Sequence, residues 1–257
     1  MTFFQRMLAS IGFGAAQVDT RLSKNAYYPG EEVEGVVHIR GGQVEQRIEE
    51  IYISLVTEYK REVNNSHVKE TREIAKYLVS DPFTLGPNEE MEVPFRFRLA
   101  EHTPLTLGHT PVWFSTELDI ASAIDPSDSD RIEVIPSPEM QVVFDAADQL
   151  GFRLREAEVK QSPRFGGRIG LLQEFEFVPA GRFRSELDEL EISFLPATEG
   201  LELLLQIDRK ARGLAGFIAE AADADETLLR LRIHPADLGR GPSYMAGVLA
   251  ELIQDHL

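Results

Sequence analysis

The sequence predicts an all-β protein built from two tandem antiparallel β-sandwiches, with short terminal and linking helices. Hydrophobic and polar residues alternate along 92–99, which is typical of a half-buried strand. The same period of two returns in both halves of the chain. Two prolines in 136–138 separate the halves, and neither fits inside a helix or a central strand. We therefore expect one sandwich over 1–136 and a second over 137–257.

The composition is that of a globular protein and argues against several classes of partner. The chain has 257 residues, of which 43% are hydrophobic and 27% charged. Its net charge of −17 would repel phosphate backbones, so we expect no nucleic acid partner. The chain has no cysteine, which excludes disulfides and thiolate metal sites and suits a cytoplasmic location. No apolar run reaches the roughly 20 residues of a membrane span.

The N-terminal segment, 1–16, has the spacing of a short amphipathic helix. A signal peptide is the alternative, but the apolar stretch is short and is interrupted by Ser10, Gly12 and Gly14. The hydrophobic stripe of the helix is formed by Phe4, Met7, Leu8 and Ile11.

In the N-terminal half, strands are expected wherever the alternation is clear. A turn at 28–31 precedes the first of these, and the polar stretch 60–72 is expected to be a hairpin with an exposed tip. Pro94 cannot donate a ladder hydrogen bond, so its strand is predicted to be an edge or bulged strand. The acidic stretch 125–130 is predicted to be a loop. The expected strands are 33–39, 51–59, 74–79, 92–99, 113–120 and 132–135.

In the C-terminal half, helices flank a further set of strands. A helix is expected over 140–150, ended by Gly151, and a helical turn or short helix over 213–222. The most amphipathic helix is predicted for 242–257, starting at Gly241-Pro242. Its stripe contains Met245, Val248, Leu249 and Leu252. The expected strands are 174–177, 189–194, 201–207 and 229–233.

No catalytic, metal or cofactor motif is present in the sequence. The six histidines lack the spacing of metal ligands, and no phosphate-binding glycine loop occurs. Asp125, Asp128 and Asp130 offer oxygen ligands for calcium, but their spacing is not that of an EF-hand, and a solvated turn is the simpler interpretation. We therefore expect no catalytic residue, no metal site and no cofactor.

Two pairs of glutamates resemble the acid pair of a glycosidase at first sight. They are Glu174 with Glu176 and Glu189 with Glu191. Residues two apart on a strand lie side by side, whereas a catalytic acid and base must converge on a substrate from separate positions. We instead expect them to pair with arginines on a neighbouring strand, the candidates being Arg153 and Arg155.

Six segments, taken in order, resemble the bacterial sporulation-control proteins, which are stage-zero regulators with an arrestin-like fold. The resemblance covers nearly the whole chain and implies two β-sandwiches joined end to end, a role in regulation through protein contacts, and no enzymatic activity. The segments are YYPGEEV (27–33), LDI followed by DP (118–126), LGFRLR (150–155), EFEFVP (174–179), LDELE (187–191) and QIDRKARG (206–213).

We therefore predict a non-enzymatic regulator or adaptor that binds other proteins through sandwich edges, the groove between its domains or its terminal helices. The stripes of both helices are the candidate contacts; docking on the protein's own body or on a second copy is the alternative. Two other functions stay open. One is a carbohydrate-binding or glycoside-processing sandwich around Trp113, although we expect that side chain to be at least partly buried. The other is a calcium-dependent adhesion module at Asp125, Asp128 and Asp130.

Overall fold

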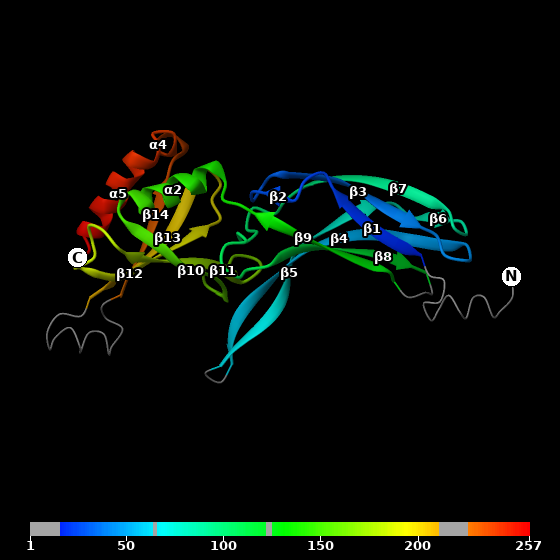
Figure 1. Ribbon diagram of the computed structural model, residues 1–257, viewed down its shortest axis with the longest axis horizontal. Helices are drawn as coiled ribbons and strands as arrows, with labels where there is room; N and C mark the ends of the chain where they lie inside the picture. Colours follow the sequence, from blue (N-terminus) through cyan, green and yellow to red (C-terminus); the bar gives the residue numbers. More distant parts are fainter. Residues whose placement is uncertain (1–15, 64–65, 122–124, 211–225) are drawn as a thin grey trace. The chain divides into compact units, whose positions relative to one another are not determined.

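The computed structural model describes residues 16–63, 66–121, 125–210 and 226–257, and most of them lie in β-strands (Figure 1). The prediction of an all-β fold with short helices is therefore confirmed. The chain divides into two compact units. That the two halves fold as separate domains divided at residue 136 stays a prediction. The N-terminal unit takes in the described parts of Met1–Glu58, Thr71–Thr106 and Pro111–Ile135; the C-terminal unit takes in those of Tyr59–Glu70, Leu107–Thr110 and Pro136–Leu257.

The N-terminal unit contains two sheets. One has the strand order β1-β3-β7, and the other continues from β4 through β8 and β9 to β2, with β5 and β6 also paired to β4. The far ends of β4 and β5 belong to the C-terminal unit. The strands are β1 (Gln17–Leu22), β2 (Ala26–Tyr27), β3 (Glu32–Arg40), β4 (Gln46–Val63), β5 (Ser66–Ser80), β6 (Phe83–Leu85), β7 (Glu90–Arg98), β8 (Val112–Ile120) and β9 (Ser127–Val134).

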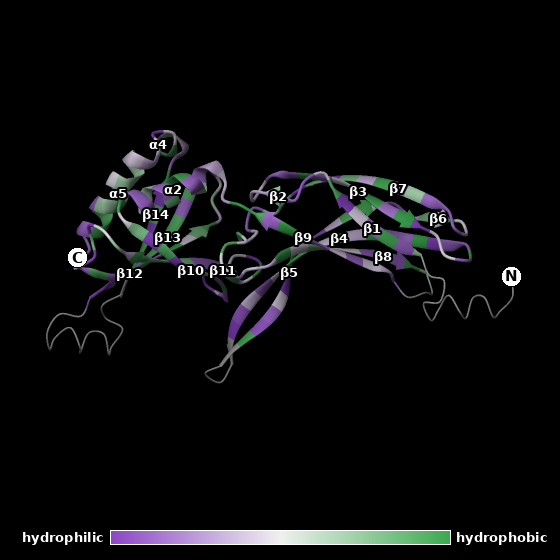
Figure 2. Cartoon of the chain, in the orientation of Figure 1, coloured by the Kyte–Doolittle hydropathy of each residue, from purple (hydrophilic) through white to green (hydrophobic). Residues whose placement is uncertain are grey.

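The two sheets enclose a hydrophobic core. Figure 2 shows hydrophobic and hydrophilic residues alternating along these strands. In the predicted strand 33–39, which forms part of β3, Val33, Val37 and Ile39 are fully buried. Phe97 of β7 meets Phe114 of β8 edge to face, with ring centroids 5.5 Å apart, and so joins one sheet to the other.

Strand β7 is the outer strand of its sheet, as the proline predicts. It pairs with β3 alone, and Pro94 lies opposite Val36. Just beyond its two ends, Leu99 donates to the Glu31 carbonyl and accepts the Gly30 amide, and the Glu89 carbonyl accepts the Gly41 amide, so both residues face the β3 side. In an antiparallel ladder only alternate residues do so, and Pro94 belongs to the other set. Its nitrogen therefore faces the free edge, where no ladder bond is lost.

The C-terminal unit is an antiparallel sheet with helices on one face (Figure 1). Phe144 of α2 packs edge to face on Phe175 of β11 and Phe194 of β12, at centroid distances of 5.1 and 5.6 Å, and α5 packs against α2. The elements are α2 (Pro138–Gln149), β10 (Phe152–Gln161), β11 (Leu171–Pro179), β12 (Leu187–Leu195), β13 (Leu201–Arg209), β14 (Glu226–Ile233), α4 (Pro235–Leu238) and α5 (Pro242–Gln254).

Both predicted helices that fall within the described residues form, and their ends follow the local chemistry. The Ser137 hydroxyl accepts the Met140 amide at 3.2 Å and caps α2, and Gly151 follows its end with a φ of 81°. Helix α5 begins after Gly241, as predicted. The prediction for 213–222 lies outside the described residues.

One loop prediction is wrong. The stretch 125–130 was expected to be a loop, but β9 begins at Ser127 and pairs with β8 from that residue on. Asp and Ser have low strand propensity, and the neighbouring strand overrides it here by supplying ladder partners.

Candidate functional site

The candidate site is the face of the C-terminal sheet that lies opposite the helices. Along β11 the alternation sends Phe175 and Phe177 into the core and Glu174 and Glu176 outward. The other strands behave in the same way, so charged side chains collect on the outer side. We call this surface the charged sheet face; it comprises Lys60, Arg155, Glu156, Glu158, Lys160, Glu174, Glu176, Glu189, Glu191, Glu202, Arg230 and Arg232.

Strand register places like charges directly opposite one another on this face. Glu158 of β10 is the partner of Glu174 on β11, and Glu176 on β11 is the partner of Glu191 on β12. Opposed carboxylates on neighbouring strands repel and destabilise a sheet. Cations must therefore lie between them.

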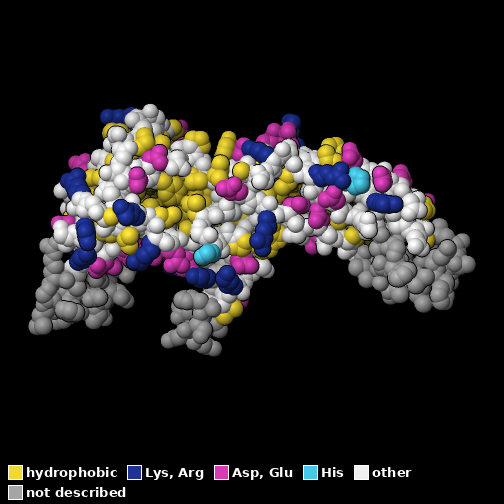
Figure 3. Space-filling view, viewed as in Figure 1, with side chains coloured by type: hydrophobic (Ala, Val, Ile, Leu, Met, Phe, Trp, Pro, Cys, Tyr) yellow, Lys and Arg dark blue, Asp and Glu magenta, His cyan; other side chains and the backbone are white. Residues whose placement is uncertain are grey.

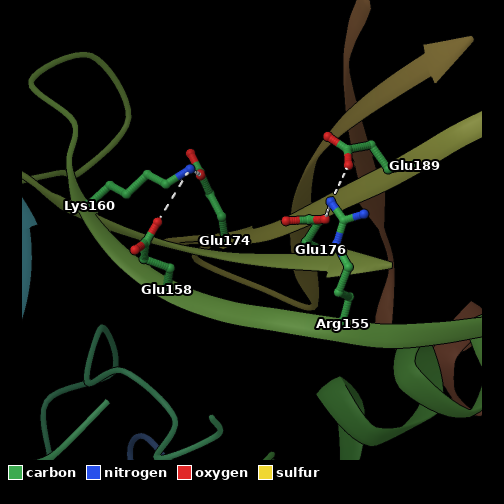
Figure 4. Close-up of polar contacts among 6 residues, drawn as sticks. All are labelled: Arg155, Glu158, Lys160, Glu174, Glu176 and Glu189. Carbon is green, nitrogen blue, oxygen red and sulfur yellow. Dashed lines mark hydrogen bonds and ion pairs between the residues drawn. The ribbon is translucent and has the colours of Figure 1, made fainter. Parts of the chain in front are cut away.

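Two cations supply this compensation (Figure 4). The guanidinium of Arg155 contacts the carboxylate of Glu176 and lies 2.6 Å from Oε2 of Glu189. The ammonium of Lys160 lies 2.5 Å from Oε2 of Glu174 and 3.7 Å from Oε2 of Glu158. The predicted pairing with Arg155 is thus seen, whereas Arg153 is exposed on the same strand.

A third cation reaches this cluster from the long hairpin. Lys60, near the end of β4, is the parallel partner of Lys160 on β10. Its ammonium contacts Glu158 and lies 3.5 Å from Glu156. The hydrogen bond to Glu158 raises the pKa of Lys60 and outweighs burial. Burial by itself would lower the pKa of Lys160, but the hydrogen bond to Glu174 and the nearby carboxylates raise it overall.

At the far side of the same face, a buried carboxylate holds two arginines. Glu202 on β13 is only 7% exposed. Arg230 and Arg232 of β14 approach its two oxygens at 3.2 and 3.0 Å. The guanidinium of Arg230 also lies 5.9 Å from the ring centroid of Phe165. Both ends of the charged sheet face therefore consist of fixed ion pairs.

This arrangement presents a fixed pattern of charges on a sheet surface. The glutamates that resembled a glycosidase pair lie side by side along their strands, and the cations hold Glu174, Glu176 and Glu189 in place. Among the described residues, no group of three or more His, Cys, Asp or Glu side chains is placed to hold a metal ion. On the side of the molecule drawn in Figure 3, acidic and basic side chains are likewise interspersed.

Of the two sets of residues predicted to bind partners, the structure describes only the one in α5. The N-terminal stripe, Phe4, Met7, Leu8 and Ile11, lies outside the described residues. In α5, Met245 and Leu249 are buried and Val248 and Leu252 are half-buried, which is the arrangement of the alternative in which the helix docks on the protein's own body. A role for these residues in partner binding stays a prediction.

The residues of the two other candidate functions also have defined surroundings. Oδ1 of Asp125 accepts the Ile120 amide at 2.9 Å, and Oδ2 of Asp128 accepts the Thr20 amide at 2.7 Å, so both carboxylates hold backbone in place. Trp113 is half-buried on the outer side of β8. That agrees with the expectation that it is at least partly covered.

Five of the twelve residues of the charged sheet face were predicted from the sequence, and the others were not. The glutamate pairs and Arg155 follow from alternation on single strands. Lys60 and Lys160 were missed because their meeting depends on a parallel contact between strands a hundred residues apart in sequence. Glu202 was missed because its burial depends on β14 as a neighbour, although the alternation of Arg230 and Arg232 with leucines was a usable signal.

Comparison with known proteins places the chain in a family. Among the described residues, no helix is long and apolar enough to cross a membrane. The family model described as SpoOM protein matches residues 4–211. The sporulation-control protein spo0M of Bacillus subtilis (strain 168) is 42% identical over 257 residues, which span 100% of this chain and 99% of that protein. The crystal structure of Spo0M from Bacillus subtilis matches with a TM-score of 0.84 and 42% identity, covering 95% of this chain and 100% of the other. The chain belongs to the SpoOM protein family.

Proposed function

We propose that this protein is a non-enzymatic regulatory adaptor of the cytoplasm that acts by binding other proteins. The full-length similarity to a sporulation-control protein supports a regulatory role. The acidic, cysteine-free composition suits a cytoplasmic protein.

The observation that carries the adaptor role is the charged sheet face. Its carboxylates are oriented by Arg155 and Lys160, so their positions are set before a partner arrives. Charges that are fixed in advance favour recognition of one complementary surface and raise the rate of encounter. Small substrates bind in concave, mostly apolar pockets, whereas protein interfaces extend over many residues, and an array of charged side chains across several strands fits the second description better.

The surroundings of the acids favour this function over the two alternatives. A glycosidase needs two carboxyl groups separated across a substrate. Here Glu174 and Glu176 are neighbours on one strand and contact Lys160 and Arg155. A calcium module needs several free oxygens that converge on one point, whereas Asp125 and Asp128 each use one carboxylate oxygen to accept a backbone amide.

Photocrosslinking in cells tests the adaptor role on the full chain. A photoreactive amino acid replaces Gln206, which lies between Glu191 and Leu228 in the register, and in a matched protein it replaces Glu117 on the outer side of β8. We expect specific protein adducts from the position at Gln206, reduced when Glu156→Lys alters the charge pattern, and unchanged with Glu117→Lys. Adducts that are the same from both positions, or that ignore the Glu156 reversal, contradict the proposed surface.

The regulatory role is tested separately in Bacillus subtilis. The full chain replaces the resident spo0M, and sporulation frequency is compared with that of the parent strain and of a strain lacking spo0M. We expect this chain to move the frequency toward the parent value. A strain that behaves like the deletion in spite of normal protein levels contradicts a shared regulatory role.

A further inference from the structure

Strand β9 carries two aspartates on the side that faces the core. Asp128 and Asp130 alternate in step with Ile132 and Val134, which are buried. Their ladder partners on β8 are Thr116 and Phe114, both buried. Carboxylates at core-facing positions break the alternation of a sandwich strand. A buried carboxylate at such a position costs stability unless it is hydrogen-bonded or protects the edge of the sheet from pairing with another strand.

These aspartates lie where the two sheets of the N-terminal unit meet. Strand β2 pairs with β9 only at Glu133 and Val134, so the first half of β9 has no ladder partner on that side among the described strands. Strand β1, which belongs to the other sheet, approaches it there. The Thr20 amide of β1 donates to Oδ2 of Asp128 at 2.7 Å, and the Thr20 and Thr116 hydroxyls are 2.6 Å apart and buried. Single polar contacts, in place of a ladder, close this edge.

At this edge, two carboxylates lie close together without a cation to compensate them in the contacts described above. Oδ2 of Asp130 is buried without a hydrogen-bond partner among the described residues. Burial, the charge and hydrogen bond of Asp128, and the charge of Asp19 on β1 raise the pKa of Asp130 to about 6. Asp130 therefore holds a proton in mildly acidic solution, and its hydrogen bond with Asp128 places that proton between the two side chains.

Few other charges face this pair from the packed strands. Arg21 of β1 is paired with Asp19 at 2.9 Å, and both side chains are more than half exposed. The charged groups nearest on β8 and β9, Glu117 and Arg131, belong to the outward-facing set. Tyr27 of β2 uses its hydroxyl to donate to the Lys24 carbonyl.

We propose that Asp128 and Asp130 form a proton-operated latch, which holds β1 against β9 when the two carboxyl groups share a proton and releases it when both are charged. The shared proton satisfies the buried oxygen and removes the repulsion. Without it, two carboxylates face each other next to the bond from Thr20. The N-terminal unit then opens at this edge in preference to others.

The direction of the pH dependence follows from linkage. A carboxyl group whose pKa is raised by folding stabilises the closed form below the ordinary pKa of 3.8, and this contribution is lost as the pH rises toward 6. With a pKa of about 6 in the closed form and 3.8 in the open form, the equilibrium constant for opening rises at most roughly tenfold between about pH 5 and about pH 7.5. Because the site is partly solvated, we expect about three- to tenfold.

Hydrogen exchange on the full chain tests the latch. Exchange is corrected for its intrinsic pH dependence and measured in peptides over Gln17–Leu22 and the start of β9, with β13 as the internal reference. We expect the protection of the first two to fall about three- to tenfold over this pH range and that of β13 to stay constant. Asp130→Asn, which keeps the size and adds an amide donor, should make both profiles flat. Glu133→Gln, on the outward side of the same strand, should leave them unchanged.

Three results would each overturn the latch. The first is a wild-type profile at β1 and β9 that does not depend on pH, and it needs no variant. The second is an Asp130→Asn protein whose profile keeps the wild-type slope. The third is a gain in protection on adding calcium at constant pH that exceeds the gain from acid, since a cation and not a proton would then close the edge.

Discussion

Replacing Arg155 by methionine tests whether the charged sheet face depends on its cations. Methionine keeps an unbranched apolar stem like that of arginine and removes the charged guanidinium. Arg155 is the shared partner of Glu176 and Glu189, whose side chains are 18% and 23% exposed. Without it, Glu176 faces its strand partner Glu191 with less compensation. We expect the C-terminal unit to lose stability and the N-terminal unit to be unaffected.

The magnitude follows from two contacts of intermediate exposure. Exposed ion pairs contribute about 0.2–1 kcal/mol each, and hydrogen bonds to charged groups about 1.5–3 kcal/mol. Arg155 is 52% exposed, which places its contacts near the lower figure. The opposed glutamates add roughly 0.2–1 kcal/mol when the cation is removed. The expected loss is therefore about 0.6–3 kcal/mol at low salt, and it should shrink in about 1 M NaCl, where screening acts over about 3 Å.

The two units can be followed separately in one urea titration. Trp113 is the only tryptophan of the chain and lies in the N-terminal unit, so its fluorescence reports on that unit. The helices of the described residues, α2, α4 and α5, all belong to the C-terminal unit and dominate its far-UV circular dichroism. The matched control is Arg153→Met on the same strand, which should change stability by less than about 0.5 kcal/mol. Equal losses in the two variants, or a loss that salt leaves unchanged, would refute the reasoning.

Three further substitutions have defined outcomes. Gly35→Ala places a Cβ 2.6 Å from the Phe95 ring and should cost the N-terminal unit about 1–3 kcal/mol, seen by tryptophan fluorescence; an unchanged midpoint contradicts the close packing. Met245→Ala removes a fully buried side chain of α5 and should cost the C-terminal unit about 2–5 kcal/mol by circular dichroism, whereas a neutral result means the helix docks weakly. The pKa of Lys160 is raised, so its contribution is complete below the ordinary value of 10.5 and is lost above it. Lys160→Met should thus be less stable than wild type near neutral pH, and the deficit should fade in strong alkali; a constant deficit would assign the effect to packing alone.

The fold could be predicted from the sequence wherever one side of a strand is buried. Val33, Val37 and Ile39 show this, because a half-buried strand must alternate. The start of β9 could not be predicted, since Asp128 and Asp130 occupy core-facing positions that the period assigns to apolar residues. Local chemistry indicated a turn there, and only pairing with β8 makes a strand of it.

The charged sheet face shows the same division between local and distant causes. Its glutamates are visible in the sequence because each alternates with a buried residue on its own strand. Which cation neutralises which acid depends on the register between strands, as for Lys60 beside Lys160. Register is a property of a pair of strands and cannot be predicted from the sequence of one strand alone.

The proline on the outer strand of the N-terminal unit bears on how crowded copies of this protein behave. The nitrogen of Pro94 points away from β3 and carries no hydrogen. A strand from another molecule that paired with the free edge of β7 would therefore lack one backbone hydrogen bond near the middle of the strand. Arg96 and Arg98, which are largely exposed, add charge beside the gap. The free edge of β7 is therefore a poor template for fibre growth. At high concentration in a cell, copies of this protein are protected from edge-to-edge polymerisation at β7 by the strand's own residues.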